Sequence, residues 1–416
     1  MSEYKLTVKL EQYTPLLHFQ GDQQGACLRA TEVKPKLDRF IVGYLKQHGA
    51  DIPDGWQQKP ERRDYVALRY KLHISAGSEQ PANNQAAPFK KLYFADMDSE
   101  NKGKEPIRLI LHDENILTIL CFASGMTQID GEDCSMGRLL EILLPPFFAI
   151  HTFGARSSKG FGSYGVMSIE NKQPQAISPS RLMEFLPNPD PEYFLSNQSS
   201  VFYAEYSNRS LGWESRLNDV VTLSTLTKGG LNFGTAFIRG FIRKYTSLGN
   251  ARSEKALIKT KILISAAADR DEMTKHPKLQ PANPSDPFLY KRGVLGLAQT
   301  YEYKGLRKGK VSVKMEDRTI ERFHNPILFK PHGKYLFLIP QPIPHKLVEH
   351  KAILSNGRHN EAISMPHAFD LTDFLDSFAK WYNRRSDPEF KSVQMFTGGG
   401  FDFKSTFARI GKIERA

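Results

Sequence analysis

The sequence predicts an α+β protein of two domains, each built on an antiparallel sheet. Three observations support this prediction. The chain has 416 residues, 40% of them hydrophobic, which is enough to bury two cores. Residues 1–173 carry strand-like and helix-like patterns in the order β, α, several β, α, β. Residues 174–200 are rich in Pro, Ser and Asn and predict a linker before a second domain over residues 201–416.

The first domain alternates between two hydrophobic periodicities. Apolar and polar residues alternate over residues 4–11, as in a half-buried strand. After a polar loop, apolar residues at helical spacing predict a helix from Pro35 to His48. Helical spacing returns in the first half of residues 136–151, and further strands are predicted over residues 65–75, 107–112, 116–123 and 162–169. This order matches the ferredoxin-like plan, two helices on one face of an antiparallel sheet, which RNA-recognition domains share.

The second domain has weaker patterns. Its predicted strands cover residues 201–206, 310–314 and 335–339, and its predicted helices cover residues 232–245 and 370–384. Two halves of similar size are what a diverged duplication of one ferredoxin-like domain would leave.

Composition narrows the class of partner. Lys and Arg number 57 against 45 Asp and Glu, and the formal net charge of +12 favours a polyanionic partner. Three cysteines without a CxxC pair disfavour disulfides and a thiolate metal site. No apolar run reaches the roughly 20 residues that span a bilayer. We therefore expect a cytoplasmic protein without membrane segment, metal or small-molecule cofactor.

The densest local signal is the glycine-rich run from Gly154 to Gly165, GARSSKGFGSYG. Glycines let the main chain approach a ligand, while Arg156, Lys159 and the neighbouring serines supply charge and donors for phosphate oxygens. A glycine-rich turn between a helix and a strand, with its cations in solvent, is the alternative interpretation. The residues alone leave both open.

A second basic cluster covers residues 28–39, LRATEVKPKLDR. Lys36 and Arg39 share a helix face, while Arg29 and Lys34 precede the predicted helix, where free N–H groups favour an anion. A solvated face of mutually neutralising charges is the other possibility for this cluster. If the ferredoxin-like plan is right, both clusters adjoin one sheet.

These motifs resemble the RAMP superfamily of CRISPR-associated proteins. The first strand, the helix opened by LRATEVKPKLDRF and the later loop GARSSKGFGSYGV carry the resemblance in the first half. In the second half, residues 291–297 (KRGVLGL), 322–330 (RFHNPILFK) and 335–340 (YLFLIP) are similar to the large two-domain subunit at the end of type III-B effector complexes.

The resemblance implies that the chain binds guide RNA, or target RNA paired to it, beside other subunits of a CRISPR effector complex. We expect backbone phosphate contacts, with Gly160 and Gly162 allowing close approach and Phe161 available for stacking, from Arg29, Lys34, Lys36, Arg39, Arg156, Ser157, Ser158 and Lys159. Weaker candidates in the second half are Arg239, Arg243, Lys291 and Arg292.

Catalysis is not implied, although some relatives cut RNA with a loop histidine or aspartate. The corresponding candidates are His18 and Asp22, which we interpret as ordinary loop residues. Two alternatives stay open. One is a metal-independent endoribonuclease that processes guide transcripts, and the other is a structural subunit whose basic surface meets acidic proteins.

Overall fold

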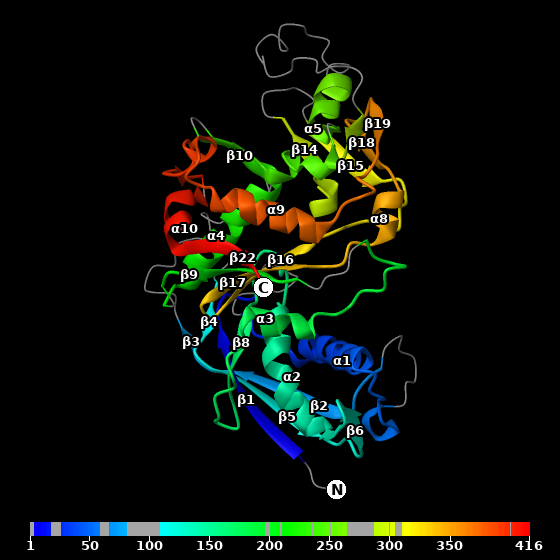
Figure 1. The fold of residues 1–416 in the computed structure, drawn as a ribbon, viewed down its shortest axis with the longest axis vertical. Coiled ribbons are helices and arrows are strands. Elements are labelled where there is room, and N and C mark those ends of the chain that lie inside the picture. The colour runs from blue at the N-terminus through cyan, green and yellow to red at the C-terminus, as the bar shows by residue number, and fades with distance from the viewer. Residues whose placement is uncertain are drawn as a thin grey trace.

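Two halves of the chain are stacked along the long axis of the molecule (Figure 1). The computed structural model describes residues 4–17, 26–58, 66–80, 109–195, 200–208, 210–233, 236–249, 251–263, 287–298, 300–303, 310–399 and 401–416. His18 and Asp22 lie outside the described residues. Within the described ranges, no helix has the length and apolar character needed to cross a membrane.

The first half is an antiparallel sheet covered by two helices. Its strands lie in the order β2 (Tyr70–Ala76), β5 (Asn115–Cys121), β1 (Tyr4–Gln12) and β8 (Tyr164–Ile169). The inward residues Leu6, Val8 and Leu10 of β1 are buried in one core with α1 (Ala30–Gln47) and α2 (Met136–Ile150). Both helices lie on the same side of the sheet (Figure 1).

The two helices are longer than their sequence patterns predict. α1 begins at Ala30 and not at Pro35, which lies inside it. Proline inside a helix removes one hydrogen bond, and the buried side chains of Val33, Leu37 and Ile41 compensate by packing on the sheet. α2 continues through Pro145 and Pro146, where almost every residue is buried. Burial therefore outweighs local preference in both helices.

Short elements complete the first half. β3 (Glu79–Gln80) pairs with β4 (Leu111–His112), and β6 (Met126–Ile129) pairs with β7 (Glu132–Ser135). The strand expected over residues 107–112 is thus only the short β4, and residues 107 and 108 lie outside the described ranges. Within residues 174–200, α3 (Pro179–Leu182) and the turn after it place Leu182 and Phe185 in the first core.

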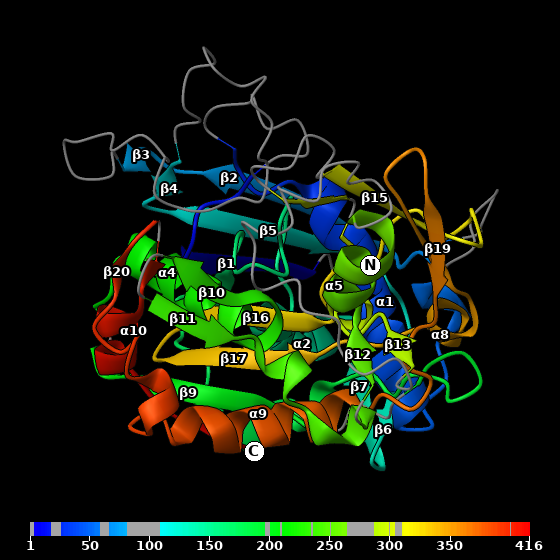
Figure 2. The same ribbon diagram turned by 90° about the horizontal axis from the view of Figure 1, so that it is seen from above.

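A second sheet repeats the strand order of the first. β9 (Phe202–Tyr206) occupies the place of β1, and the order is β16 (Ile327–His332), β17 (Tyr335–Pro340), β9 and β22 (Ile410–Arg415), with antiparallel pairing throughout. Figure 2 shows β16, β17 and β9 side by side, with α9 (Leu371–Asn383) running along them. Both halves therefore combine an antiparallel sheet with packed helices, as the α+β prediction requires.

The helix predicted over residues 232–245 is wrong. The segment forms a hairpin of β10 (Gly230–Phe233) and β11 (Ala236–Arg239), then a 3-10 turn from Phe241 to Arg243. Buried Ala236 and Ile238 alternate with exposed Phe237 and Arg239, which is the period of a strand. The apolar residues fit a helical spacing only because the hairpin and the turn are read as one segment.

The remaining described elements lie around this second sheet. A third sheet has the order β14 (Thr300–Glu302), β15 (Lys310–Met315), β18 (Ala352–Ser355) and β19 (Asn360–Ile363). The other elements are α4 (Trp213–Ser224), β12 (Arg252–Ser253), α5 (Glu254–Leu257), β13 (Phe288–Leu289), α8 (His345–Glu349), β20 (Thr397–Gly398), β21 (Phe401–Asp402) and α10 (Phe403–Arg409).

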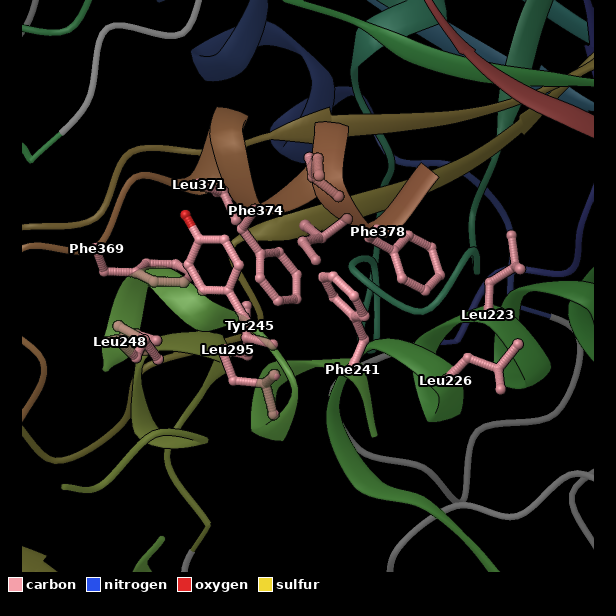
Figure 3. Close-up of a cluster of buried hydrophobic side chains, with 14 of the residues drawn as sticks. Leu223, Leu226, Phe241, Tyr245, Leu248, Leu295, Phe369, Leu371, Phe374 and Phe378 are labelled. Carbon is pink, nitrogen blue, oxygen red and sulfur yellow. The ribbon is translucent and has the colours of Figure 1, made fainter. Parts of the chain in front are cut away.

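Aromatic side chains form a cluster within the core of the second half. The ring of Phe241 lies between Phe374 and Phe378 of α9, with centroid separations of 5.4 and 5.7 Å (Figure 3). Tyr245 and Leu295 lie below α9 in the same cluster. This packing places the segment containing Leu295 beside α9.

The two halves share a buried contact. Lys330 of β16 is 0% exposed, and its Nζ donates to the carbonyl oxygens of His151 at 2.8 Å and Tyr164 at 3.0 Å. The hydroxyl of Ser163 donates to the carbonyl oxygen of Pro331. Lys330 and its neighbours therefore fix the end of α2 and the start of β8 against the second sheet.

Candidate nucleic-acid interface

A cavity of about 1570 Å³ lies where the glycine-rich loop of the first half meets the second half. Its lining comes from that loop, from α4 and the π-helical turn after it (Thr225–Gly229), from α5, from residues 292–300 and from residues 312–325. The lysines and arginines among the described lining residues are Arg156, Lys159, Lys228, Lys255, Arg292, Lys314, Arg318 and Arg322, against two carboxylates, Glu316 and Glu321. The cavity is therefore strongly basic.

The glycine-rich loop contributes three polar residues to the lining, namely Arg156, Ser158 and Lys159. Arg156 has a φ of +57°, and the amide of Lys159 donates to its carbonyl oxygen at 2.9 Å, which closes a tight turn. Lys159 also forms a parallel β-bridge with Phe329 of β16, which attaches the loop to the second sheet. Ser157 is not part of the lining.

The loop glycines serve the packing of the chain itself. Gly162 has a φ of +62°, and a Cβ there would collide with the carbonyl oxygen of Phe153. Gly160 is buried against Val220 of α4. Phe161 is only 2% exposed and lies in a cluster with Leu217, so its ring has no open face for a base. The expected stacking on Phe161 therefore does not fit its position.

Two motifs of the second half meet in the cavity lining. The amide of Leu297, in the LGL segment, donates to the carbonyl oxygen of Phe323 at 3.0 Å. Between them, Gly296 has a φ of +104°, and a Cβ there would lie 3.0 Å from the amide nitrogen of Asn325. The glycine-rich loop, the LGL segment and the RFHN segment, three of the segments that carry the sequence resemblance, therefore border one cavity.

The second half supplies basic side chains at two depths. Lys228, Lys255 and Arg292 are partly buried. At the rim, the exposed side chains are Lys314, Arg318, Arg322 and His324. A single strand of nucleic acid has phosphates at regular spacing, which such a distribution of cations can neutralise.

The cations of α1 occupy a different environment. Lys34 Nζ lies 2.8 Å from Asp38 and donates to the carbonyl oxygen of Leu68 at 2.9 Å. Lys36 Nζ donates to the carbonyl oxygen of Thr152 at 3.0 Å, and burial lowers its pKa. Both amines therefore hold α1 to the rest of the first half. Arg29 and Arg39 are exposed and are not part of the cavity lining.

Of the four weaker candidates, the structure brings only Arg292 to the cavity. Lys291 is 4% exposed, and its Nζ donates to the carbonyl oxygen of Gly249 at 3.3 Å. Arg243 is not in the cavity lining, and Arg239 is exposed on β11. Lys291 and Arg292 are thus adjacent in the sequence, but their side chains lie in different surroundings.

Sequence analysis missed Lys228, Lys255, Lys314 and Arg318, which all line the cavity. Lys228 precedes Gly229 and Gly230, and this glycine pair is a sequence signal that could have identified it as a candidate. The other three lie in segments whose relation to the glycine-rich loop exists only in the folded chain. In the described ranges, no group of three or more His, Cys, Asp or Glu side chains is placed to hold a metal ion.

Comparisons with known proteins agree with this arrangement of two halves. The sequence matches the family model of the Cmr1 N-terminal domain over residues 3–209 and that of the Cmr1 C-terminal domain over residues 238–397. A similar solved structure is the crystal structure of Cmr1 from Pyrococcus furiosus in its apo form, with 11% identity, 58% of this chain and 80% of that chain covered, and a TM-score of 0.32. None of the curated protein sequences matches the chain.

The two domain matches lie in chain order and together span most of the sequence. They confirm the resemblance that the glycine-rich loop and the LGL segment indicated. The chain belongs to the Cmr1 family, the two-domain RAMP proteins of type III-B CRISPR effector complexes.

Proposed function

We propose that this protein binds RNA for a type III-B effector complex, holding guide RNA, or guide RNA paired to its target, by the phosphate backbone in the cavity between its halves. The observation that carries the proposal is the excess of eight lysines and arginines over two glutamates in the described lining. Phosphate contacts dominate the affinity of such interfaces and are independent of base sequence. The other subunits of the complex and the RNA are then its partners in the cytoplasm.

The shape of the two halves supports this proposal. Each main sheet has the strand order expected of a ferredoxin-like domain, with the second strand at one edge and the last at the other. We interpret both halves as ferredoxin-like domains that meet at the glycine-rich loop. Arg156 and Lys159 are then the residues of the first half that contact RNA phosphates. Arg29 and Arg39 stay predictions, for an RNA strand that continues beyond the cavity over α1.

The test is a binding titration with a single-stranded RNA at several salt concentrations. The double variant Arg156→Gln/Lys159→Gln should weaken binding of every RNA sequence. It should also lower the slope of log affinity against log salt by about one to two units, because each phosphate contact to a single strand contributes about 0.7. An unchanged slope would remove the loop from the interface.

The matched control is Arg138→Gln/Lys172→Gln. These two residues are exposed in the first half and do not line the cavity. The control should keep the wild-type slope, because it removes the same charges from a surface that makes no phosphate contact.

The alternative function, a basic surface that binds acidic proteins, predicts a different result. The native complex would then hold no RNA and would be insensitive to ribonuclease.

A further inference from the structure

Three basic side chains from separate segments meet in the buried part of the cavity lining. Lys228 lies in the turn after α4, Lys255 in α5, and Arg292 in the loop before the LGL segment. We call these three residues the inner basic group. Because they come from distant parts of the sequence, no local pattern groups them, and only the fold brings them to one place.

Arg292 lines the cavity and has a buried donor without a partner. Its Nε donates to Glu254, and its guanidinium lies 4.7 Å from the ring centroid of Tyr301. Its side chain is 11% exposed, and its Nη2 is buried without a hydrogen-bond partner among the described residues. A buried donor without a partner costs free energy, which a ligand with an acceptor oxygen recovers.

The two lysines have more positive than negative neighbours. Lys228 Nζ donates to the carbonyl oxygen of Gly296 at 2.6 Å, and Lys255 makes no ion pair that the described residues show. Burial lowers the pKa of Lys228 to about 7, helped by the charges of Arg292 and Lys159 and opposed by Glu254. Keeping Lys228 protonated in this site therefore costs free energy.

The pKa of Lys255 is shifted in the same way. Burial lowers its pKa to about 7, with contributions from Arg292, Arg243 and Lys259, and Glu254 opposes this shift. Glu254 is 0% exposed, its Oε1 pairs with Arg292, and its Oε2 is buried without a hydrogen-bond partner. One carboxylate carries one negative charge and cannot neutralise an arginine and two lysines. An anion from outside the chain would satisfy all three members of the inner basic group.

We propose that the inner basic group binds one phosphate group of the RNA and that binding at this site takes up protons. This inference rests on the proposed function. A phosphate offers several acceptor oxygens, which suit the free Nη2 of Arg292 together with two ammonium groups. Its negative charge favours the protonated form of both lysines, so they take up protons when an RNA strand enters the cavity.

The experiment measures the affinity for a hydroxyl-ended RNA between pH 6 and pH 8, at constant salt. Its phosphodiesters do not titrate in this range. Each lysine with a pKa near 7 passes from about nine-tenths charged to one-tenth charged, so wild-type affinity should fall by about tenfold per lysine, or about a hundredfold in all. Lys255→Met should reduce that change to about tenfold.

Two control variants separate the inner basic group from the rest of the cavity. Lys314→Met makes the same substitution at an exposed lysine of the lining and should weaken binding by a constant factor at every pH. His324 also lines the cavity, so His324→Gln should retain the decrease in affinity above pH 7. A wild-type affinity that does not change with pH, or a Lys255→Met profile equal to wild type, would overturn the inference.

The source of the phosphate is distinguished by a second RNA of the same sequence with a terminal phosphate. If the added phosphate strengthens binding to wild type but not to Lys255→Met, the site takes the end of the strand. If it has no effect while the pH dependence persists, the site takes an internal phosphodiester. RNA that binds at no pH would overturn the proposed function, whereas RNA that binds equally at all pH values overturns this inference alone.

Discussion

Two regions of the molecule contain several basic side chains with little negative charge beside them. One is the junction group, made of Lys36, His151, Lys330 and His332, where the halves pack together. The other is the inner basic group of the cavity. In the junction group, Lys330 and Lys36 donate to main-chain carbonyl oxygens of the other packed elements. In the cavity, Arg292 keeps an unpartnered nitrogen.

The difference teaches how to separate structural cations from those that await a ligand. Burial lowers the pKa of Lys330 well below its ordinary value, as it does for Lys228 and Lys255. The direction of the shift therefore does not distinguish the regions, and neither does a partner alone, because Lys228 donates to Gly296 and His332 Nδ1 is buried without a partner. The difference is the cavity, which all three members of the inner basic group line and no member of the junction group lines.

The largest effect is expected at Lys330. Lys330→Met keeps the volume but leaves the carbonyl oxygens of His151 and Tyr164 without this donor in a buried place. At about 1–2 kcal/mol for each unsatisfied acceptor, the free energy of unfolding should fall by about 2–4 kcal/mol. Urea unfolding at neutral pH measures this change through the midpoint at constant slope.

Lys334→Met is the matched control for that variant. Lys334 follows Lys330 closely in the chain, but its amine pairs with Glu205 on the surface. Exposed ion pairs contribute little to stability, so the control should unfold at the wild-type midpoint. Equal midpoints for Lys330→Met and wild type would show that the junction carbonyls do not need the amine.

The second-largest effect is expected from acid, which should lower the stability that the junction group contributes. Burial lowers the pKa of His151 to about 4 and that of His332 to about 3, below the ordinary value of 6.5. The unfolded chain therefore binds more protons than the folded chain below pH 6.5, and stability is lost as the pH falls from 6.5 towards 4. The loss for His151 is up to about 3 kcal/mol.

Urea midpoints between pH 4 and pH 7 measure this loss. His151→Gln keeps a donor for the carbonyl oxygen of Phe147, which lies 2.9 Å from Nδ1, and should flatten the acid side of the profile. His367→Gln should leave the profile as it is, because that ring is exposed to water in the folded protein. A His151→Gln profile as steep as wild type would contradict the assignment.

Sequence periodicity predicted the first half better than the second. β1, β5 and β8 follow clear alternation, and their antiparallel pairing fits the predicted plan of one sheet under two helices. In the second half, the hairpin of β10 and β11 was mistaken for a helix, because two short strands and a turn together mimic helical spacing. Tertiary packing decides such short segments.

The candidate site was predicted in part. The glycine-rich loop and the residues after Lys291 were singled out, and Arg156, Lys159 and Arg292 do border the cavity. Lys255 and Lys314 could not be predicted, because they lie 96 and 155 residues after Lys159 in the sequence, and only the folded chain brings them to the loop. Conversely, Lys34 and Lys36 fit a phosphate site by residue type alone, and only the structure shows the acceptors that already occupy them.

The smallest expected effect is at Lys36, where residue type and surroundings give opposite predictions. Lys36→Met removes the hydrogen bond to Thr152 and should lower the free energy of unfolding by about 1 kcal/mol. RNA affinity should change by less than about twofold and the salt slope should stay at the wild-type value, because an amine that serves the fold makes no phosphate contact. Titration of this variant beside Lys159→Met, which removes the same group from the cavity, measures the contrast. A slope lowered by about 0.7 in Lys36→Met would place Lys36 on the RNA and end the distinction between the two regions.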